Sequence, residues 1–147
     1  MVSQIDYTTF NVIEDNLDLR MLFPLYQELG EYDYSFLKDK APMDQAVRDS
    51  LVMDAFRGLW KTVVATHNDK PVGFISISTD YGKDTISELF VLEPYRRLGI
   101  GRELVRRLKE FTPGKLKVNT IAGNEASLAF YESLGFVAVT ISLTEIN

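Results

Sequence analysis

Residues 87–101 read SELFVLEPYRRLGIG, an apolar run that ends near a proline and leads into a helix. The run closes a predicted strand over residues 85–92, which stops before Pro94. After Gly99, apolar side chains recur at the spacing of one helix face, at Ile100, Leu104, Leu108 and Phe111. The segment therefore predicts a strand, a glycine-containing turn and a helix in direct succession.

The turn carries two arginines and two glycines, Arg96, Arg97, Gly99 and Gly101. Glycines let the backbone approach a ligand closely, and the first turn of a helix offers unpaired N–H groups that bind phosphate. Arginines add charge-assisted donors. The pattern predicts a pyrophosphate site, and the alternative is an ordinary turn with solvated arginines. It matches neither Gly-x-Gly-x-x-Gly nor the Gly-Lys-Ser/Thr phosphate loop, which disfavours dinucleotide and nucleoside triphosphate sites.

Glu88 lies inside the predicted strand, among apolar neighbours. Strand alternation places it on one face with Ile86, Phe90 and Leu92. Because the opposite face is apolar too, we expect burial to raise the pKa of this carboxyl group. Such a group suits a general base that takes a proton from an ammonium group or through a water. The alternative is a structural carboxylate that pairs with a neighbour or lies at the sheet rim.

Residues 124–136, NEASLAFYESLGF, form a second segment whose side chains could take part in a reaction. It predicts a helix over residues 124–134 with a core stripe formed by Ala126, Ala129, Phe130 and Leu134. Asn124, Leu128 and Tyr131 follow a neighbouring line on the helix. A phenol such as Tyr131 can return a proton to a leaving group. The alternative is a helix cap at Asn124 and a tyrosine at the domain rim.

Composition excludes several classes of protein. The 147 residues contain no cysteine and one histidine, so disulfide scaffolds, thiol nucleophiles and multi-histidine metal sites are excluded and no metal is expected. No apolar run exceeds four residues, which predicts no membrane span. The N-terminus lacks a basic region followed by an apolar stretch, so we expect a cytoplasmic protein.

Charge is segregated along the chain although its net value is -5. Residues 1–57 hold 5 basic and 11 acidic side chains, whereas residues 94–117 hold 8 basic and 2 acidic ones. A nucleic-acid binder is usually basic overall, so no nucleic-acid partner is expected. The local cationic segment favours a smaller anion such as a phosphorylated cofactor, and the alternative is a solvated helix face.

The whole chain predicts one α/β domain over residues 1–147 with a mixed sheet, in the order β-α-α-β-β-β-α-β-α-β. Before residue 85 the expected elements are a strand at 5–13, a helix at 17–29, a loop at 31–42, a helix at 46–56 and strands at 60–66 and 72–79. Pro24 is expected to kink or break the first helix, Gly30 to end it and Gly58 to end the second. A turn at 80–84 and strands at 115–121 and 136–143 complete the prediction.

Together these segments resemble the GCN5-related N-acetyltransferase (GNAT) family. The strand that leads into Arg96-Arg97-Leu98-Gly99-Ile100-Gly101 is similar to the Arg/Gln-x-x-Gly-x-Gly/Ala acetyl-CoA motif of that family. Residues 124–136 are similar to its second motif, which ends in Tyr-Glu-x-x-Gly-Phe. The motifs cover about a third of the chain and occur in the family's order. The resemblance implies a mostly antiparallel mixed sheet flanked by helices, and direct acetyl transfer from acetyl-CoA to a primary amine in a ternary complex.

The resemblance also implies residue roles. Backbone N–H groups from Arg97 to Arg102 would hold the CoA pyrophosphate, a set that comprises Arg97, Leu98, Gly99, Ile100, Gly101 and Arg102, with the side chains of Arg96, Arg97 or Arg102 assisting. Backbone groups of Phe90 and Val91 would pair with the pantetheine arm, and the Val91 N–H would polarise the thioester carbonyl. Asn124 would contact the cofactor arm. Tyr131 would protonate the departing thiolate and Glu88 would be the general base.

The acceptor site of this family is built largely by the first two helices and their connection. Here that region is residues 28–41, where Glu31, Asp33 and Asp39 lie beside Tyr32, Tyr34 and Phe36, and acids beside aromatics suit a cationic amine. The alternative is that these acids are ordinary surface charge. We expect a small-molecule amine, and the alternatives are a protein N-terminus or lysine, or a non-catalytic acyl-CoA-binding module. The family usually ends in a two-strand hairpin, whereas residues 137–147 suffice for one strand. A partner chain would supply the missing wall, which is the hypothesis of a homodimer.

Overall fold

A computed structural model of the chain describes residues 4–11, 20–78 and 84–145. The main sheet has four antiparallel strands in the order β1-β2-β3-β5, namely β1 (Asp6–Asn11), β2 (Leu59–His67), β3 (Lys70–Ser78) and β5 (Glu88–Val91). A separate parallel pair joins β4 (Thr85–Ile86) to β6 (Lys117–Val118). This mixed, mostly antiparallel arrangement confirms the predicted fold class.

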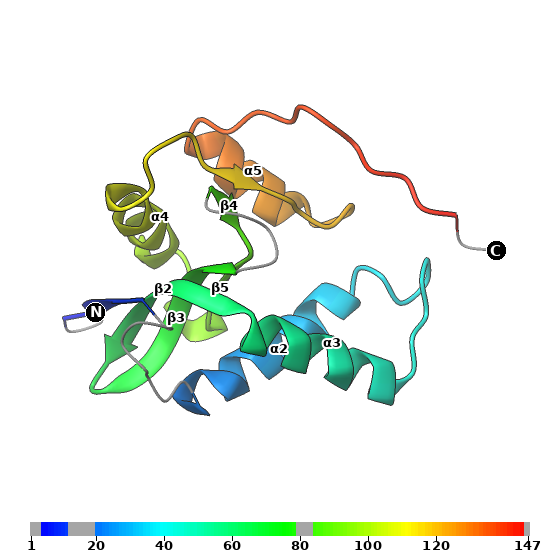
Figure 1. Cartoon of the computed structure of the whole chain (residues 1–147), viewed down its shortest axis with the longest axis horizontal. Helices are drawn as coiled ribbons and strands as arrows, with labels where there is room; N and C mark the ends of the chain where they lie inside the picture. The colour runs from blue at the N-terminus through cyan, green and yellow to red at the C-terminus, as the bar shows by residue number, and fades with distance from the viewer. Residues whose placement is uncertain (1–3, 12–19, 79–83, 146–147) are drawn as a thin grey trace.

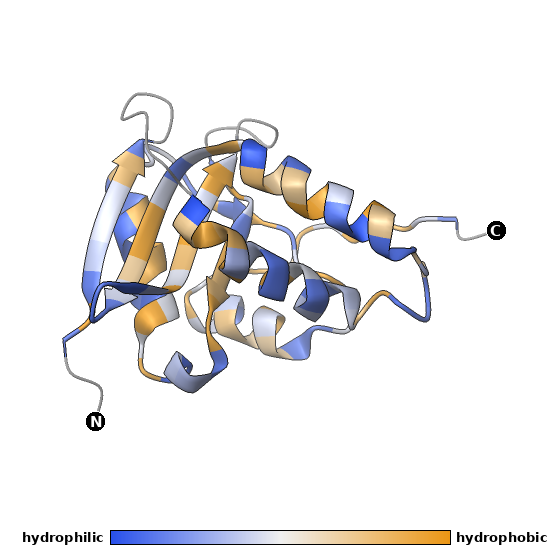
Figure 2. Cartoon of the chain, turned by 90° about the horizontal axis from the view of Figure 1, so that it is seen from below, coloured by the Kyte–Doolittle hydropathy of each residue, from blue (hydrophilic) through white to orange (hydrophobic). Residues whose placement is uncertain are grey.

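Helices cover both faces of the sheet (Figure 1). The helices are α2 (Phe23–Tyr34), α3 (Gln45–Arg57), α4 (Ile100–Glu110) and α5 (Glu125–Ser133), with short 3-10 turns η1 (Arg20–Leu22) and η2 (Glu93–Tyr95). One core cluster packs α2 against Val64, Phe74 and Phe90 of the sheet. A second packs the apolar stripe of α4 against the other face, around Ile75 and Ile77. Figure 2 shows the resulting concentration of hydrophobic residues along the central strands.

The first helix differs from the prediction at both Pro24 and Gly30. Pro24 lies in the first turn of α2, where a proline is tolerated, and the helix continues through Gly30 to Tyr34. A Cβ atom on Gly30 would lie 2.6 Å from Cγ2 of Val52, so this glycine allows α3 to pack closely on α2. The loop expected from residue 31 therefore begins only after Tyr34. The expected helix start at residue 17 lies outside the described residues, as do Val12 and Ile13 of the first strand and residues 80–83 of the turn.

The strand predicted over residues 85–92 is split at Ser87. The Ser87 N–H donates to the Ser76 carbonyl at 2.9 Å, while the register pairs Ser76 with Glu88, so two residues oppose one. This irregularity shifts the alternation by one residue. Ile86 packs in the cluster beneath α4, whereas Phe90 packs in the cluster beneath α2. Glu88 and Phe90 share a face as predicted, because they lie two residues apart in the regular part of β5, but the prediction that Ile86 shares this face was wrong.

Two expectations near the C-terminal end were also wrong. Ala126 and Ala129 of the predicted α5 core stripe are exposed, and the most deeply buried residue of the helix is Tyr131, at 5% exposure. The strand expected over residues 136–143 does not form, because no neighbouring strand lies beside this segment in the described chain. The strand expected over residues 115–121 shortens to Lys117–Val118. By contrast, Gly58 ends α3 as predicted, and Asn124 caps α5, which the sequence analysis had given as the alternative to a functional role.

Candidate active site

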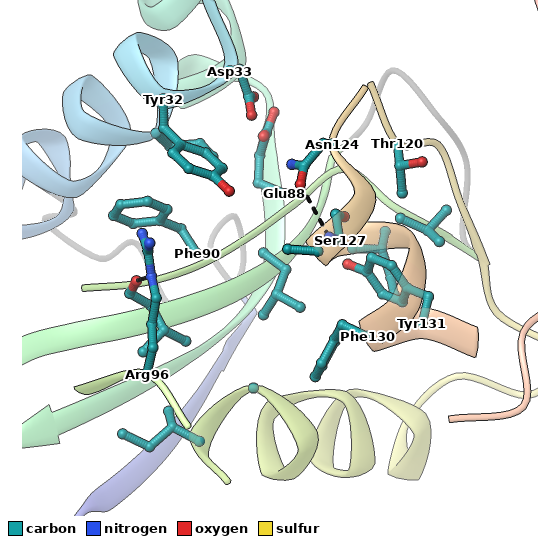
Figure 3. A pocket seen from close by; sticks show the side chains of 18 of the residues that line it. Tyr32, Asp33, Glu88, Phe90, Arg96, Thr120, Asn124, Ser127, Phe130 and Tyr131 are labelled. Carbon is teal, nitrogen blue, oxygen red and sulfur yellow. Dashed lines mark hydrogen bonds between the residues drawn. The ribbon is translucent and has the colours of Figure 1, made fainter. Parts of the chain in front are cut away.

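The split between β5 and the β4–β6 pair opens a pocket of about 610 Å³ (Figure 3). Its walls are the end of α2, strand β5, the start of α4, the chain from Val118 to Ile121, and α5. The pocket brings together thirteen of the sixteen residues that sequence reasoning singled out: Tyr32, Asp33, Glu88, Phe90, Val91, Arg96, Arg97, Gly99, Ile100, Gly101, Arg102, Asn124 and Tyr131. Leu98, Glu31 and Tyr34 are not among its lining residues.

The start of α4 forms one end of the pocket. Gly99 is the N-cap with φ 84°, a left-handed conformation that favours glycine, and no side chain caps the helix. A Cβ atom on Gly101 would lie 3.2 Å from the Phe130 ring, so this glycine lets α4 approach α5 closely. Arg97 is also left-handed, with φ 64°. The first N–H groups of α4 therefore face the pocket without side-chain competition, as an anion site requires.

The outer edge of β5 is the second backbone feature. The Leu92 N–H donates to the Val72 carbonyl of β3 at 2.8 Å. Because peptide groups alternate in direction along a strand, those of Val91 and Leu89 turn away from β3 toward the pocket. The backbone of Phe90 turns toward β3 instead. The backbone groups that face outward beside those of Val91 are therefore those of Leu89, and not those of Phe90 as expected. The sequence did not indicate Leu89, because the break at Ser87 cannot be predicted from it.

The Arg96 side chain contacts this edge of β5. Its Nε donates to the Val91 carbonyl at 2.8 Å, and its guanidinium carbon lies 5.2 Å from the Tyr32 ring centroid and 5.4 Å from that of Phe90. Both distances are in the range of cation–π contacts. Figure 3 shows Arg96 beside Phe90 rather than directed along α4. Arg96 therefore joins β5 to the end of α2, while Arg97 and Arg102 remain beside the helix start.

Glu88 lies half-buried in the middle of the pocket, at the N-terminal end of β5. Burial, followed by the charge of Asp33, raises its pKa to about 8. The carboxyl group is therefore largely protonated at pH 7 and ionises as the pH rises through about 8. A pKa near the working pH is the property that a general base needs.

Asp33 comes from the last turn of α2 and points toward Glu88 (Figure 3). Burial raises its pKa to about 6, so this carboxylate is mostly ionised at neutral pH. The Tyr32 ring lies beside it on the pocket wall. An ionised carboxylate next to an aromatic face is a favourable environment for a cation.

Glu31 and Tyr34 have structural contacts elsewhere. Both oxygens of Glu31 accept from Nη1 of Arg48, at 3.0 and 2.9 Å, which ties α2 to α3. The Tyr34 hydroxyl donates to the Met43 carbonyl at 3.1 Å, and the Arg48 guanidinium lies 4.3 Å from its ring centroid. Only the residues on the other side of this helical turn, Tyr32 and Asp33, reach the pocket.

The α5 wall supplies an amide and a phenol. The Asn124 Oδ1 accepts from the Ser127 N–H at 3.1 Å, so a contact from Asn124 to a ligand would use its Nδ2 donor. Tyr131 is held by edge-to-face contacts with Phe130 and Phe136, at centroid distances of 5.1 and 5.2 Å. Burial, followed by the charge of Glu88, raises the pKa of Tyr131. The phenol therefore keeps its proton at neutral pH.

A buried chain of hydroxyl groups lies behind Glu88. The Tyr26 hydroxyl is 3.1 Å from Oγ of Ser76, which is 3.1 Å from Oγ of Ser87 on the pocket wall. Tyr26 and Ser76 are 2% and 0% exposed, so these groups are satisfied by one another. Sequence reasoning missed this chain because its members lie on α2, β3 and the break after β4.

The model of the acetyltransferase (GNAT) family matches residues 21–136, which include all of these walls. The chain belongs to the acetyltransferase (GNAT) family. Among curated proteins the comparison finds no match.

Solved structures agree with the GNAT assignment. A GNAT-family acetyltransferase from Streptococcus pneumoniae is 20% identical, with a TM-score of 0.64 over 98% of each chain. The aminoglycoside N-acetyltransferase AAC(6')-Iy in complex with CoA is 16% identical, with a TM-score of 0.66 over 97% of this chain and 93% of its own. The same enzyme with a bisubstrate analogue of CoA and acetylneamine is 14% identical, with a TM-score of 0.60 over 97% of each chain. At these identities the likeness shows the fold alone.

The described residues contain neither a candidate metal site nor a candidate membrane span. Within residues 4–11, 20–78 and 84–145, no group of three or more His, Cys, Asp or Glu side chains is placed to hold a metal ion. No helix in this part of the GNAT chain is long and apolar enough to cross a membrane.

Proposed function

We propose that this GNAT protein transfers the acetyl group of acetyl-CoA to a small cationic primary amine, directly and without an acyl-enzyme. One observation carries the proposal: a single pocket holds the uncapped start of α4, the outer edge of β5 and the carboxyl pair of Glu88 and Asp33. An anion site, a strand edge and a base are the three features that a thioester donor and an amine require together.

The residues present fit the donor. The N–H groups at the start of α4 suit the pyrophosphate, with Arg97 and Arg102 beside them. The peptide groups of Leu89 and Val91 suit the amides of an extended arm, since an open strand edge accepts an added strand. The Val91 N–H, on that edge, would stabilise negative charge on the thioester oxygen.

The chemical step needs three proton transfers. The ammonium group of the acceptor gives one proton to the Glu88 carboxylate, directly or through water, and the neutral nitrogen forms a bond to the acetyl carbon. The carbon–sulfur bond breaks as the Tyr131 hydroxyl gives a proton to the departing sulfur, and the second proton that the nitrogen loses as the amide forms restores the Tyr131 hydroxyl through water. The raised pKa values of Glu88 and Tyr131 support these roles, because the former accepts a proton near neutral pH and the latter retains one.

The proposed class of acceptor is based on the residues on the other side of the pocket. Asp33 and Tyr32 would hold the charge of a polyvalent amine while the reacting amine group lies at Glu88. The similarity to an aminoglycoside acetyltransferase is consistent with a polyamine-like acceptor but does not select one.

The test is a turnover assay with acetyl-CoA and matched acceptors: a diamine, the amino alcohol in which a hydroxyl replaces one of its two amines, an aminoglycoside, and peptides with a free N-terminus or a lysine. We expect the highest kcat/KM on acceptors with a second positive charge. Faster turnover of peptides would favour a protein acetyltransferase. CoA binding in a thermal-shift assay, with no turnover of any acceptor, would favour a binding module.

A further inference from the structure

A hydroxyl group that the proposed chemistry does not use lies in the core between α2 and the sheet. The Tyr26 side chain is 2% exposed, stacks on Phe74 at a centroid distance of 4.6 Å and meets Phe56 edge-to-face at 5.7 Å. Its hydroxyl lies 3.1 Å from Oγ of Ser76. Burial raises the pKa of Tyr26, so this hydroxyl keeps its proton and acts as a donor. A phenylalanine would make the same ring contacts, and the hydrogen bond to Ser76 is what distinguishes Tyr26.

The hydrogen bonds that begin at Tyr26 run in one direction. The Ser76 carbonyl accepts from both the N–H and the hydroxyl of Ser87, at 2.9 and 3.0 Å. Because Ser87 uses its one hydroxyl proton there, Ser76 is the donor in the 3.1 Å contact between the two serine hydroxyls. The Tyr26 hydroxyl then donates to Ser76. This hydroxyl chain therefore ends on Ser87, where the predicted strand is split.

One end of the hydroxyl chain fixes Glu88. Ser87 is the extra residue opposite Ser76, and Glu88 follows it directly, in register with Ser76. An irregularity of this kind re-aims the side chain beside it, so its conformation sets the direction in which Glu88 leaves the strand. The two hydrogen bonds from Ser87 to one carbonyl leave that conformation little freedom.

The other end of the hydroxyl chain fixes Asp33. Tyr26 and Asp33 lie at positions i and i+7 of α2, about two turns apart, and therefore share a face of the helix. Asp33 points from this face toward Glu88 (Figure 3). The contacts of Leu25 and Leu29 with the sheet are apolar and have no preferred direction. The hydrogen bond from Tyr26 holds α2 at one point along the sheet, and with it the position of Asp33.

We propose that Tyr26, acting through Ser76 and Ser87, is a positioning residue that holds Glu88 and Asp33 beside one another in the pocket. The proposal rests on the proposed function, in which the first carboxyl group takes a proton and the second holds the acceptor. Placement matters because a displacement of about 1 Å can lower the rate of an enzyme by up to about 100-fold.

The ionisation of Glu88 reports on this placement. Its surroundings hold ionisable groups from α2, α5 and the start of α4, namely Tyr26, Tyr32, Asp33, Tyr131, Arg96, Arg97 and Arg102. Burial, followed by the negative charge of Asp33, raises the pKa of Glu88 to about 8. If α2 loosens, Asp33 moves away and water enters, so both causes weaken. The pKa of Glu88 then falls toward that of an ordinary carboxyl group.

The first test follows the Glu88 carboxyl signal by NMR in protein with ¹³C-labelled glutamate, and Glu88→Gln identifies the signal. In the wild type we expect it to titrate near pH 8. Tyr26→Phe keeps the ring contacts and removes the hydroxyl, so the midpoint should fall. Ser87→Ala breaks the other end of the hydroxyl chain and should lower the midpoint too. The double variant should lower it no further than the larger single change, because both substitutions act through one chain.

Thr62→Val is the matched control. Thr62 lies opposite Ser76 in the register of β2 and β3, is 0% exposed, and its Oγ1 has no hydrogen-bond partner in the described part of the chain. The substitution removes a hydroxyl from the same region of the core and leaves the hydroxyl chain intact, so the midpoint should stay near pH 8. An unchanged midpoint in both Tyr26→Phe and Ser87→Ala overturns the proposal, as does an equal fall in Thr62→Val.

The pH profile of kcat/KM separates this proposal from the proposed function. In Tyr26→Phe we expect the plateau at high pH to fall by about tenfold and the step to move down with the NMR midpoint, while KM for acetyl-CoA stays unchanged. An NMR midpoint that moves, with no step in the wild-type profile, supports the positioning role and contradicts Glu88 as the base. A lower melting temperature with an unchanged midpoint and profile shows a merely structural role for Tyr26 and overturns the proposal.

Discussion

The two halves of the pocket differ in what they are made of. The half proposed to bind the donor, here called the donor half, consists of backbone groups from one continuous stretch, the edge of β5 and the start of α4. The half proposed to bind the acceptor, here called the acceptor half, consists of side chains, Tyr32 and Asp33 on α2, which meet Glu88 only when the helix packs on the sheet. Backbone groups can hold a chemically constant ligand with few side chains. Side chains from a helix that is distant in the sequence can differ between proteins with different acceptors, while the backbone groups that hold the donor stay the same.

The largest effect should come from Glu88, where the two halves meet. Glu88→Gln keeps the shape of the side chain but removes the base, so we expect kcat/KM to fall by about 10²–10⁴-fold. CoA affinity, measured by calorimetry, should stay within a factor of about two. Glu93→Gln is the control, since Glu93 is exposed in η2 and does not line the pocket. Retention of most activity by Glu88→Gln would mean that another group takes the proton.

Tyr131→Phe should have the next largest effect. It keeps the ring contacts with Phe130 and Phe136 and removes the hydroxyl, so we expect kcat to fall by about 10²-fold with little change in melting temperature. Tyr34→Phe is the matched control, because the Tyr34 hydroxyl contacts the Met43 backbone. An equal response of the two variants would point to a structural cause.

A smaller effect should separate the acceptor half from the donor half. Asp33→Asn should raise KM for a dicationic acceptor by about tenfold, which corresponds to about 1.4 kcal/mol, and leave KM for acetyl-CoA unchanged. It should also lower the pKa of Glu88, because the Asp33 charge raises it. Glu31→Gln is the control, because Glu31 lies two residues away on the same helix and is paired with Arg48. If both variants bind the dication equally well, Asp33 does not hold the acceptor.

The smallest effect should come from the donor half. Gly99→Ala forces a Cβ into a left-handed conformation at a cost of about 1–2 kcal/mol, so we expect KM for acetyl-CoA to rise a few-fold and the melting temperature to fall by several degrees. Gly114→Ala is the control, because Gly114 has no positive φ and nothing within 4 Å of a Cβ position. A change in acceptor KM alone would contradict the division into two halves.

The same difference explains what could be predicted from the sequence. The turn at Gly99 and the stripe of α4 depend on neighbours within a few residues, and both were predicted correctly. The cap at Asn124 is equally local, and the sequence offered it as an alternative. Gly30 was predicted to end its helix, which was wrong. Its role is to allow close packing against Val52, and this contact could not be predicted because the two residues are more than twenty positions apart. The break at Ser87 depends on β4 leaving β5 to pair with β6, which no local pattern indicates.

The sequence separated the residues proposed for the acceptor from their neighbours only in part. Composition marked Glu31, Tyr32, Asp33 and Tyr34 as one group, because all four are acidic or aromatic. Their helical phase on α2 decides which ones face Glu88, and that phase became visible only when the helix was found to continue past Gly30. Residues 136–143 were predicted as a strand from their alternation, but a strand needs a neighbour, and the described residues place none beside them.

The most direct test of the account is the pH dependence of kcat/KM for the wild type and for Glu88→Gln, with one acceptor whose own pKa lies well above the range. Because burial and Asp33 raise the pKa of Glu88 to about 8, the base is protonated below that pH. Wild-type kcat/KM should rise through an apparent pKa near 8 and then level, and this step should be missing from the variant. The same step in both proteins, or a wild-type profile that is flat from pH 6 to pH 9, would contradict the assignment of Glu88 as the base that joins the two halves.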